Sequence, residues 1–172
     1  MKHSELIQSV LSPLAEKSQQ AYMSNLLQVA DILQWVLDQT GPASVKMASF
    51  SISEEFLRRL FFIEKSGLIK DIDIILDFKA TNKTLILWPF IAQTVKNCYL
   101  ASSHAKILLV GNEDWSVSVV MSQNLTRGNR FESGFISTSQ EVYDTLLHQV
   151  EFVINNQSVP FHEVFSRTIT KN

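Results

Sequence analysis

The stretch SHAKILLVGNEDWSVSVVMSQNLT, residues 103–126, decides the fold. It contains two runs rich in Val, Leu and Ile, 106–110 and 116–121, which are separated by the polar turn 111–114. Two such runs joined by a short turn that contains glycine predict a β-hairpin. Because the strands of a hairpin are antiparallel, the sheet to which they belong cannot be purely parallel.

Strands and helices alternate on both sides of this hairpin. Before it, residues 44–52 and 72–78 are expected as strands, and Ser53 is expected to cap a helix that ends at Gly67. The other expected elements are a helix at 83–95, short strands at 98–100 and 134–137, and a helix at 141–154. This alternation predicts an α/β fold, a mixed β-sheet flanked by helices on both faces.

The first forty residues are expected to be helical. Leu6, Val10 and Leu14 are spaced by four, and an apolar stripe with helical period runs from Leu26 to Leu37. Gly41 and Pro42 end this region. We therefore expect residues 1–41 to be an N-terminal helical extension, packed on an α/β domain that spans residues 42–172.

Composition narrows the class of protein. The chain has 172 residues, of which 45% are hydrophobic and 19% charged, as in a soluble globular protein with one core. No apolar run approaches the roughly 20 residues that cross a bilayer, so we expect a cytoplasmic location without stable membrane insertion. A single cysteine, Cys98, excludes an internal disulfide and a cysteine-based zinc site. The net charge of −2 implies that any phosphate binding is local, through a few placed donors.

Four polar residues at the ends of the hairpin can converge. Side chains two apart on a strand point to the same side, which pairs His104 with Lys106 and Ser122 with Asn124. The hairpin brings the second pair back beside the first. Lysine and asparagine can donate to the non-bridging oxygens of a phosphate, and histidine can attack phosphorus or transfer a proton. These residues predict a phosphate pocket.

The pattern His-x-Lys followed by Ser-x-Asn-Leu-Thr resembles the signature of the phospholipase D-like phosphodiesterase superfamily. The resemblance is to single-motif, nuclease-like members of bacterial or phage type. It implies a phosphohistidine on His104, with no metal or other cofactor, and a catalytic set of His104, Lys106, Ser122, Asn124 and Glu132. In that family the glutamate orients the histidine, so Glu132 is expected to hydrogen bond His104, directly or through one water.

The chain departs from the family pattern at two positions. Gly111 stands where the family has an aspartate, whose usual role is structural, and Met121 stands where a glycine precedes the serine. Two arginines, Arg127 and Arg130, flank the motif and either bind a substrate phosphate or are simply solvated.

We therefore predict a metal-independent phosphodiesterase, most simply a nuclease. Its partners would be a phosphodiester substrate, a nucleic acid, and a second copy of the chain. The homodimer is expected because one histidine cannot attack phosphorus and protonate the leaving oxygen in the same step. The alternative is a non-catalytic module that binds phosphate or nucleic acid with the same pocket. A phospholipid headgroup hydrolase is a third hypothesis. In the plainest interpretation, the histidine closes a strand, the lysine is solvated, and the serine and asparagine form turns.

Overall fold

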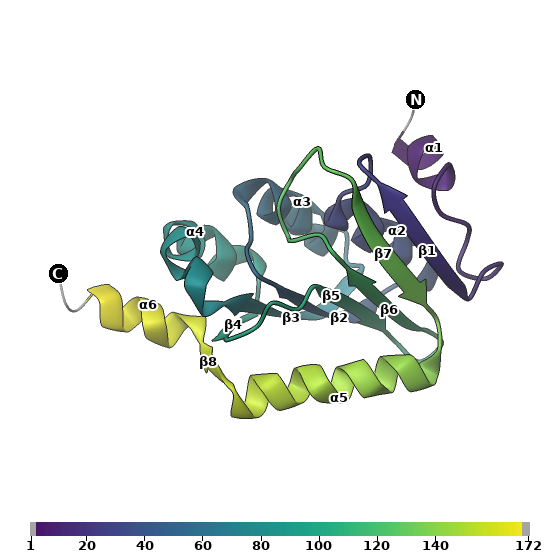
Figure 1. Cartoon of the computed structure of the whole chain (residues 1–172). Helices are drawn as coiled ribbons and strands as arrows, with labels where there is room; N and C mark the ends of the chain where they lie inside the picture. The colour runs from purple at the N-terminus through teal and green to yellow at the C-terminus, as the bar shows by residue number, and fades with distance from the viewer. Residues whose placement is uncertain (1–2, 170–172) are drawn as a thin grey trace.

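The computed structural model describes the backbone of residues 3–169 and the side chains of residues 6–80 and 84–166. In this part of the chain all strands join one sheet, in the order β1-β7-β6-β5-β2-β3-β4-β8 (Figure 1). The strands are β1 (Gln19–Ser24), β2 (Ala43–Ser49), β3 (Ile69–Asp77), β4 (Asn97–Ala101), β5 (Ile107–Gly111), β6 (Ser116–Met121), β7 (Glu132–Ser137) and β8 (Ser158–Pro160). The helices are α1 (His3–Gln8), α2 (Val29–Thr40), α3 (Glu54–Lys65), α4 (Thr81–Thr94), α5 (Gln140–Asn156) and α6 (Phe161–Ile169), with a short 3-10 helix, η1 (Phe78–Ala80), before α4.

The sheet is mixed, as the sequence predicted. β2 pairs in parallel with β3, and β3 with β4, whereas β5 is antiparallel to both β2 and β6. Figure 1 shows α2, α3 and α4 on one side of the sheet and α5 along the other. The predicted α/β class, with helices on both faces of a mixed sheet, is confirmed.

Local sequence signals set the limits of α3. The Ser53 hydroxyl accepts a hydrogen bond from the backbone N–H of Phe56 at 3.3 Å, which satisfies one of the free donors of the first turn. Glu54 and Glu55 lie in the same turn, where the helix dipole favours negative charge. Gly67, two residues after the helix, has a φ of +78°, a conformation that glycine adopts without strain.

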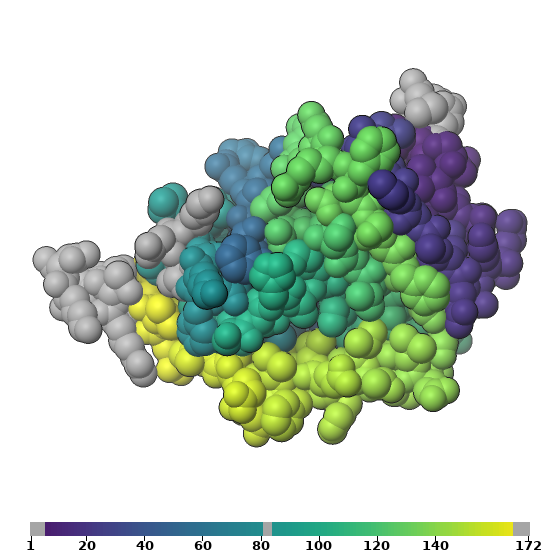
Figure 2. All heavy atoms as spheres, in the orientation of Figure 1, coloured from purple at the N-terminus to yellow at the C-terminus, as the bar shows by residue number. Residues whose placement is uncertain are grey.

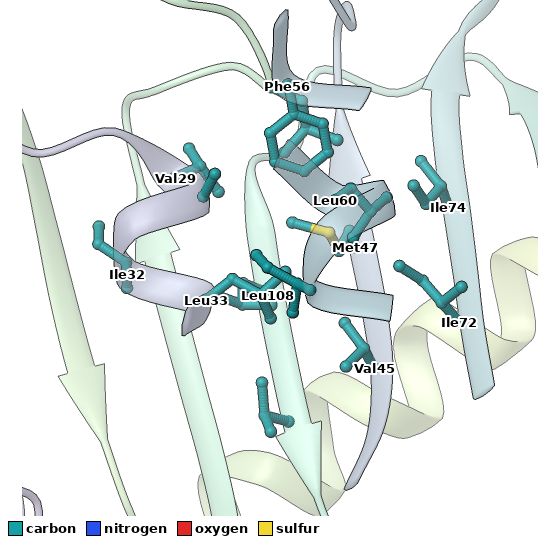
Figure 3. Close-up of a cluster of buried hydrophobic side chains, with 14 of the residues drawn as sticks. Val29, Ile32, Leu33, Val45, Met47, Phe56, Leu60, Ile72, Ile74 and Leu108 are labelled. Atoms are coloured by element: carbon teal, nitrogen blue, oxygen red, sulfur yellow. The ribbon is translucent and has the colours of Figure 1, made fainter. Parts of the chain in front are cut away.

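The larger core lies between the sheet and helices α2 and α3. Figure 3 shows Val29, Ile32 and Leu33 of α2 and Phe56 and Leu60 of α3 among side chains of β2, β3 and β5. Full burial of one such side chain stabilises the fold by about 1.5–3 kcal/mol. Helix α2, although it belongs to the N-terminal residues, therefore packs within the main core.

The expectation of helix throughout the first forty residues is wrong for β1. Its side chains alternate between exposed and buried, and the buried ones are Gln20, Tyr22 and Ser24. Because Gln20 and Ser24 are polar, the alternation of buried and exposed positions in β1 does not appear in the sequence as an alternation of apolar and polar residues. Burial of Gln20 is compensated because its amide exchanges hydrogen bonds with the backbone N–H and C=O of Ser12, both at 2.9 Å. The described part of residues 1–41 thus adds an edge strand as well as two helices.

The C-terminal elements β8 and α6 were also missed. β8 is only three residues long and pairs antiparallel with β4. At the start of α6, the Phe161 ring packs at a tilt on the Trp88 ring, with centroids 4.8 Å apart. A strand this short carries too little pattern to be recognised in sequence. Across the described chain, every helix is too short or too polar to span a bilayer.

Candidate functional site

His104 and Lys106 lie together in the segment that leads into β5. The Lys106 ammonium donates to the His104 carbonyl at 3.0 Å and lies 3.1 Å from Nδ1 of the same residue. Because a lysine ammonium only donates, Nδ1 is the acceptor and a neutral ring carries its proton on Nε2. The predicted pairing of an imidazole with a fixed positive charge is therefore present.

Asp77, the last residue of β3, holds the loop before His104 in place. One carboxylate oxygen accepts from the backbone N–H of Lys79 at 2.7 Å, and the other accepts from that of Ser103 at 3.0 Å. The Ser103 hydroxyl in turn accepts from the N–H of Ala105 at 3.3 Å. Asp77 therefore acts on the site through the backbone beside His104.

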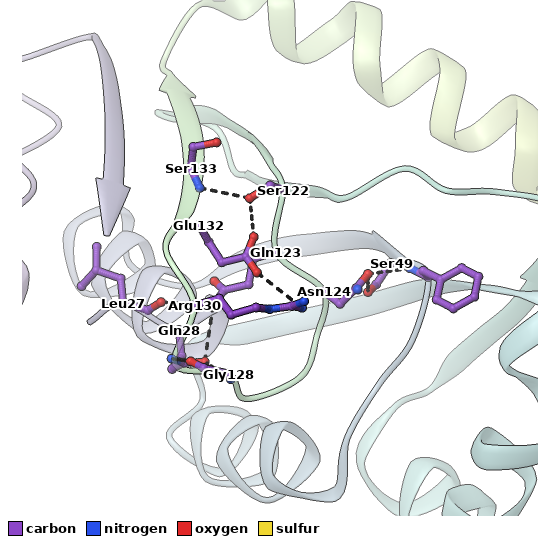
Figure 4. Close-up of polar contacts among 11 residues, drawn as sticks. Leu27, Gln28, Ser49, Ser122, Gln123, Asn124, Gly128, Arg130, Glu132 and Ser133 are labelled. Atoms are coloured by element: carbon purple, nitrogen blue, oxygen red, sulfur yellow. Dashed lines mark hydrogen bonds and ion pairs between the residues drawn. The ribbon is translucent and has the colours of Figure 1, made fainter. Parts of the chain in front are cut away.

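Asn124 is oriented by the carboxyl end of β2. Its Oδ1 accepts from the backbone N–H of Phe50 and from the hydroxyl of Ser49, both at 3.3 Å (Figure 4). No described residue accepts a hydrogen bond from the Asn124 amide nitrogen, so its two N–H donors are available to a ligand. The Phe50 ring also packs on the His104 ring, with centroids 5.3 Å apart. Phe50 thus connects Asn124 to His104, a role that no pattern in the sequence indicated.

Ser122 and Glu132 form a second polar group. The Ser122 hydroxyl donates to the Glu132 carboxylate and accepts from the backbone N–H of Ser133 at 3.0 Å (Figure 4). The expected direct hydrogen bond from Glu132 to His104 is not made between these described residues. The reason lies in the pairing of the strand ends, because the Ser122 N–H donates to the Ser133 carbonyl at 2.9 Å and keeps the hydroxyl beside Glu132.

A backbone hydrogen bond connects the segment of His104 and Lys106 to the segment of Ser122 and Glu132. The N–H of Met121 donates to the carbonyl of Lys106 at 3.1 Å, so Ser122 directly follows the strand that flanks the lysine. His104 and Ser122 are exposed, whereas Lys106, Asn124 and Glu132 are half-buried. The predicted site residues therefore gather at one edge of the sheet, without enclosure by the rest of the described chain.

The two arginines occupy different places. Arg130 is highly exposed, with a guanidinium nitrogen 3.9 Å from the Glu132 carboxylate, which puts it beside the second polar group (Figure 4). Arg127 forms an ion pair with Glu55 of α3 at 2.9 Å, and lines a small cavity at the start of α2. Arg130 is thus the better placed of the two to reach a ligand at the site.

Tyr22 of β1 lies close to Glu132. It pairs with Gly134, where a Cβ would come within 2.5 Å of the tyrosine hydroxyl, so the ring crosses β7 only because residue 134 is glycine. Burial, and secondarily the charge of Glu132, raise the pKa of Tyr22 to about 12. The hydroxyl is buried and has no hydrogen-bond partner among the described residues. The sequence did not single out Tyr22, because β1 was not recognised as a strand.

Position 111, where the family has an aspartate, lies away from this surface. Gly111 ends β5, five residues after Lys106, on the face of the sheet that α5 covers. A Cβ at this position would come within 2.2 Å of the Tyr143 hydroxyl. The tyrosine of α5 therefore fills the space that a side chain at position 111 would need.

In the described parts of the chain, no three His, Cys, Asp or Glu side chains are grouped so that they could hold a metal ion.

Solved structures share this architecture at low sequence identity. Nuc from Salmonella typhimurium, a phospholipase D family member, has a TM-score of 0.65 and 17% identity, over 83% of this chain and 97% of Nuc. NucT from Helicobacter pylori has a TM-score of 0.56 and 14% identity, over 83% of this chain and 98% of NucT. Phosphatidylserine synthase from Haemophilus influenzae has a TM-score of 0.59 and 12% identity, over 84% of this chain but only 41% of the synthase.

At the level of sequence, no protein-family model and no curated protein matches the chain. The assignment therefore rests on architecture: a mixed eight-stranded sheet between helices, shared over nearly the whole length of Nuc and NucT. The chain has the phospholipase D-like fold.

Proposed function

We propose that the chain is a metal-independent phosphodiesterase of the phospholipase D-like type, acting on nucleic acid. The observation that carries the proposal is the contact of Lys106 with His104, whose ring packs on Phe50, and the Asn124 amide that the Phe50 backbone N–H orients. The Asn124 nitrogen has no acceptor among the described residues. A phosphate that approaches this surface meets an ammonium, two amide N–H donors and an imidazole. These are the groups needed to neutralise non-bridging oxygens and to attack phosphorus.

In the proposed reaction, one His104 holds its proton on Nδ1, and its Nε2 attacks phosphorus while the bond from phosphorus to the leaving oxygen breaks. The His104 of a second copy, as an imidazolium, gives its Nε2 proton to that oxygen and becomes neutral. Water then attacks the phosphohistidine, the phosphorus–nitrogen bond breaks, and the second imidazole takes the proton of the water. Two copies are required because the chain contains one His-x-Lys and each step uses both imidazoles.

Arg130, exposed beside Glu132, is a suitable donor for a neighbouring phosphate of a polymer. A phospholipid headgroup would offer the same diester to His104 and Lys106. Both substrates therefore belong in the test.

The test is a hydrolysis screen in the presence of EDTA, with a bis-aryl phosphodiester, single- and double-stranded DNA, RNA and phospholipid vesicles. His104→Ala should lower turnover at least about 10²-fold, the lower range for loss of a group that transfers protons. The matched control is His148→Ala, which changes an exposed histidine of α5 and should leave turnover unchanged. Activity that EDTA abolishes and magnesium or zinc restores would contradict the proposed mechanism.

The second candidate is a module that binds phosphate or nucleic acid without hydrolysing it. It is favoured by the Glu132 carboxylate, which accepts from Ser122, so that His104 has no carboxylate partner in the part of the chain that the structure describes. A histidine without that partner is less well oriented for attack. Binding of labelled DNA that Lys106→Ala abolishes, with no hydrolysis of any substrate in the screen, would establish this alternative.

A further inference from the structure

Four strands contribute a row of short side chains beneath α5. Ser44 of β2 pairs with Asp71 of β3 on one side and with Gly111 of β5 on the other, and Gly111 pairs with Ser116 of β6. Paired residues of neighbouring strands point to the same face of a sheet, so the row lies on the face that α5 covers. Figure 2 shows α5, in yellow-green, along the lower margin of the molecule. Because these side chains are short, they leave a hollow between the sheet and the helix.

The hollow is a pocket of about 540 Å³. This volume lies within the range of pockets that hold small molecules, roughly 300–1,000 Å³. Three residues of α5 that are spaced by four, Tyr143, Leu147 and Glu151, line one side of it, and Glu113 of the turn between β5 and β6 lines another. The pocket is at the end of β5 that is opposite to Lys106, so it is separate from the candidate site.

Carboxylates outnumber cations in this pocket. Asp71, Glu113 and Glu151 line it, whereas Lys46 is the one basic side chain among the described residues that do so, which gives the lining a net charge of −2 at neutral pH. The Lys46 ammonium donates to Asp73 at 2.6 Å and lies 3.8 Å from Glu151. Burial acts to lower the pKa of Lys46, but the hydrogen bond to Asp73 and the nearby carboxylates raise it. The positive charge of Lys46 is therefore already compensated within the protein.

Some of the carboxylate oxygens in the pocket have no partner in the described part of the chain. One oxygen of Asp71 accepts from the Ser44 hydroxyl at 2.6 Å, and no described residue donates to the other. The Glu113 carboxylate has no ion pair and accepts no hydrogen bond among the described residues. These oxygens are available to a ligand that donates hydrogen bonds.

A buried phenol reaches the same pocket. Tyr143 is 9% exposed, and its hydroxyl lies over Gly111, where a Cβ would come within 2.2 Å of the oxygen. No described residue forms a hydrogen bond with this hydroxyl. Burial raises the pKa of Tyr143, so the phenol keeps its proton at neutral pH and can both donate and accept. A polar group buried to this degree normally has a hydrogen-bond partner, and an occupant of the pocket can supply it.

We propose that this pocket binds a small organic cation with primary ammonium groups, of the alkyl diamine class. An ammonium is a compact cation with three N–H donors and no acceptor, which matches a lining rich in carboxylate oxygens. Its N–H groups would donate to Asp71, Glu113 and Glu151, and the Tyr143 hydroxyl would accept a further hydrogen bond. A bare metal ion fits less well, because no three acidic, histidine or cysteine side chains of the described chain are grouped closely enough to hold one.

The test is isothermal titration calorimetry with putrescine, a butane diamine, and with butanediol, an uncharged molecule of the same chain length, at one fixed concentration of sodium chloride. Putrescine should bind saturably with a Kd below about 1 mM, and butanediol should not bind. Glu151→Gln should weaken putrescine binding at least about fivefold, because hydrogen bonds to charged groups contribute more than neutral ones. Tyr143→Phe keeps the ring and should weaken binding about two- to tenfold, through loss of one neutral acceptor.

Two controls separate this pocket from the rest of the molecule. Glu16→Gln removes an exposed carboxylate outside the pocket and should bind putrescine like the native chain. His104→Ala should do the same, because His104 precedes β5 and the pocket lies at the other end of that strand, so the test does not depend on any hydrolysis. Circular dichroism and thermal unfolding confirm that each variant is folded. The proposal is overturned by a native chain that shows no saturable binding of putrescine, by equal binding of butanediol, or by binding that neither Glu151→Gln nor Tyr143→Phe weakens.

Discussion

An aspartate at position 111, as in the phospholipase D-like sequence pattern, should destabilise this protein. Gly111→Asp places a Cβ where the structure has the phenol of Tyr143, 2.2 Å from its oxygen and 2.6 Å from Cζ. Tyr143 is 9% exposed and packs with Leu109 and Val150, so its ring cannot move aside without disturbing α5. The substitution therefore overfills the contact between α5 and β5.

The expected cost follows from overpacking. Extra atoms forced into a packed interior destabilise by about 1–3 kcal/mol, and leaving glycine in a strand returns roughly 0.5–1 kcal/mol. A carboxylate forced against the Tyr143 ring would also lose part of its hydration, which opposes that gain. For a chain of 172 residues, a net loss of about 1–3 kcal/mol lowers Tm by roughly 2–12 °C.

The assay is a double-mutant cycle of Gly111→Asp, Tyr143→Ala and the double variant, each followed by thermal and urea unfolding. Removing the ring gives the aspartate room, so the double variant should be more stable than the sum of the single losses, by about 0.5–3 kcal/mol. Turnover per folded molecule should not change, because position 111 lies five residues, about 16 Å, along β5 from Lys106. A Gly111→Asp variant as stable as the native chain, or a cycle without coupling, would refute the reasoning.

Three other substitutions test separate features. Tyr22→Phe removes a buried hydroxyl without a described partner and should raise the free energy of unfolding by about 1 kcal/mol, measured in urea at pH 8. The raised pKa of Tyr22 adds a pH dependence: the folded state holds the phenolic proton more tightly than the unfolded state, so stability is unaffected below pH 10 and falls as the pH approaches about 12. In Tyr22→Phe, part of this loss of stability at high pH should disappear. If the loss is the same in the variant, ionisation of Tyr22 is not its cause. Ser53→Ala should cost about 1 kcal/mol through loss of the cap of α3, whereas Ser102→Ala, in an exposed loop, should cost nothing measurable. Glu132→Gln keeps an acceptor for the Ser122 hydroxyl, so Tm should change little. If Glu132 acts on His104 through a water, turnover should fall at least about tenfold, and equal losses of turnover and stability would identify Glu132 as structural.

The hairpin and the residues at its ends could be predicted because their signals are local. The runs 106–110 and 116–121 are rich in Val, Leu and Ile, and the turn between them is polar, so strand positions follow from adjacent residues. The spacing of His104 and Lys106 then places both at the start of β5. The sequence therefore predicts those features that depend only on a strand and the strand next to it along the chain.

Other parts depend on contacts between residues distant in the sequence. Phe50 reaches His104 only because β2 pairs with β5, and nothing in the residues after β2 specifies that pairing. Glu132 was expected near the site, yet its partner is decided by how the ends of β6 and β7 align, which puts Ser122 beside it. β1 was missed because Gln20 is buried through a hydrogen bond to the Ser12 backbone, a tertiary contact that overrides hydrophobic pattern.

The contact between Lys106 and His104 sets a condition for the proposed reaction. An ammonium on Nδ1 leaves the proton of a neutral ring on Nε2, and such a ring cannot attack phosphorus through Nε2. A non-bridging oxygen of the substrate would therefore have to draw the ammonium away, so that Nδ1 can hold the proton and the lone pair of Nε2 is free. The histidine that protonates the leaving oxygen would have to be an imidazolium, with a proton on both nitrogens, so the lysine beside it would also have to leave Nδ1.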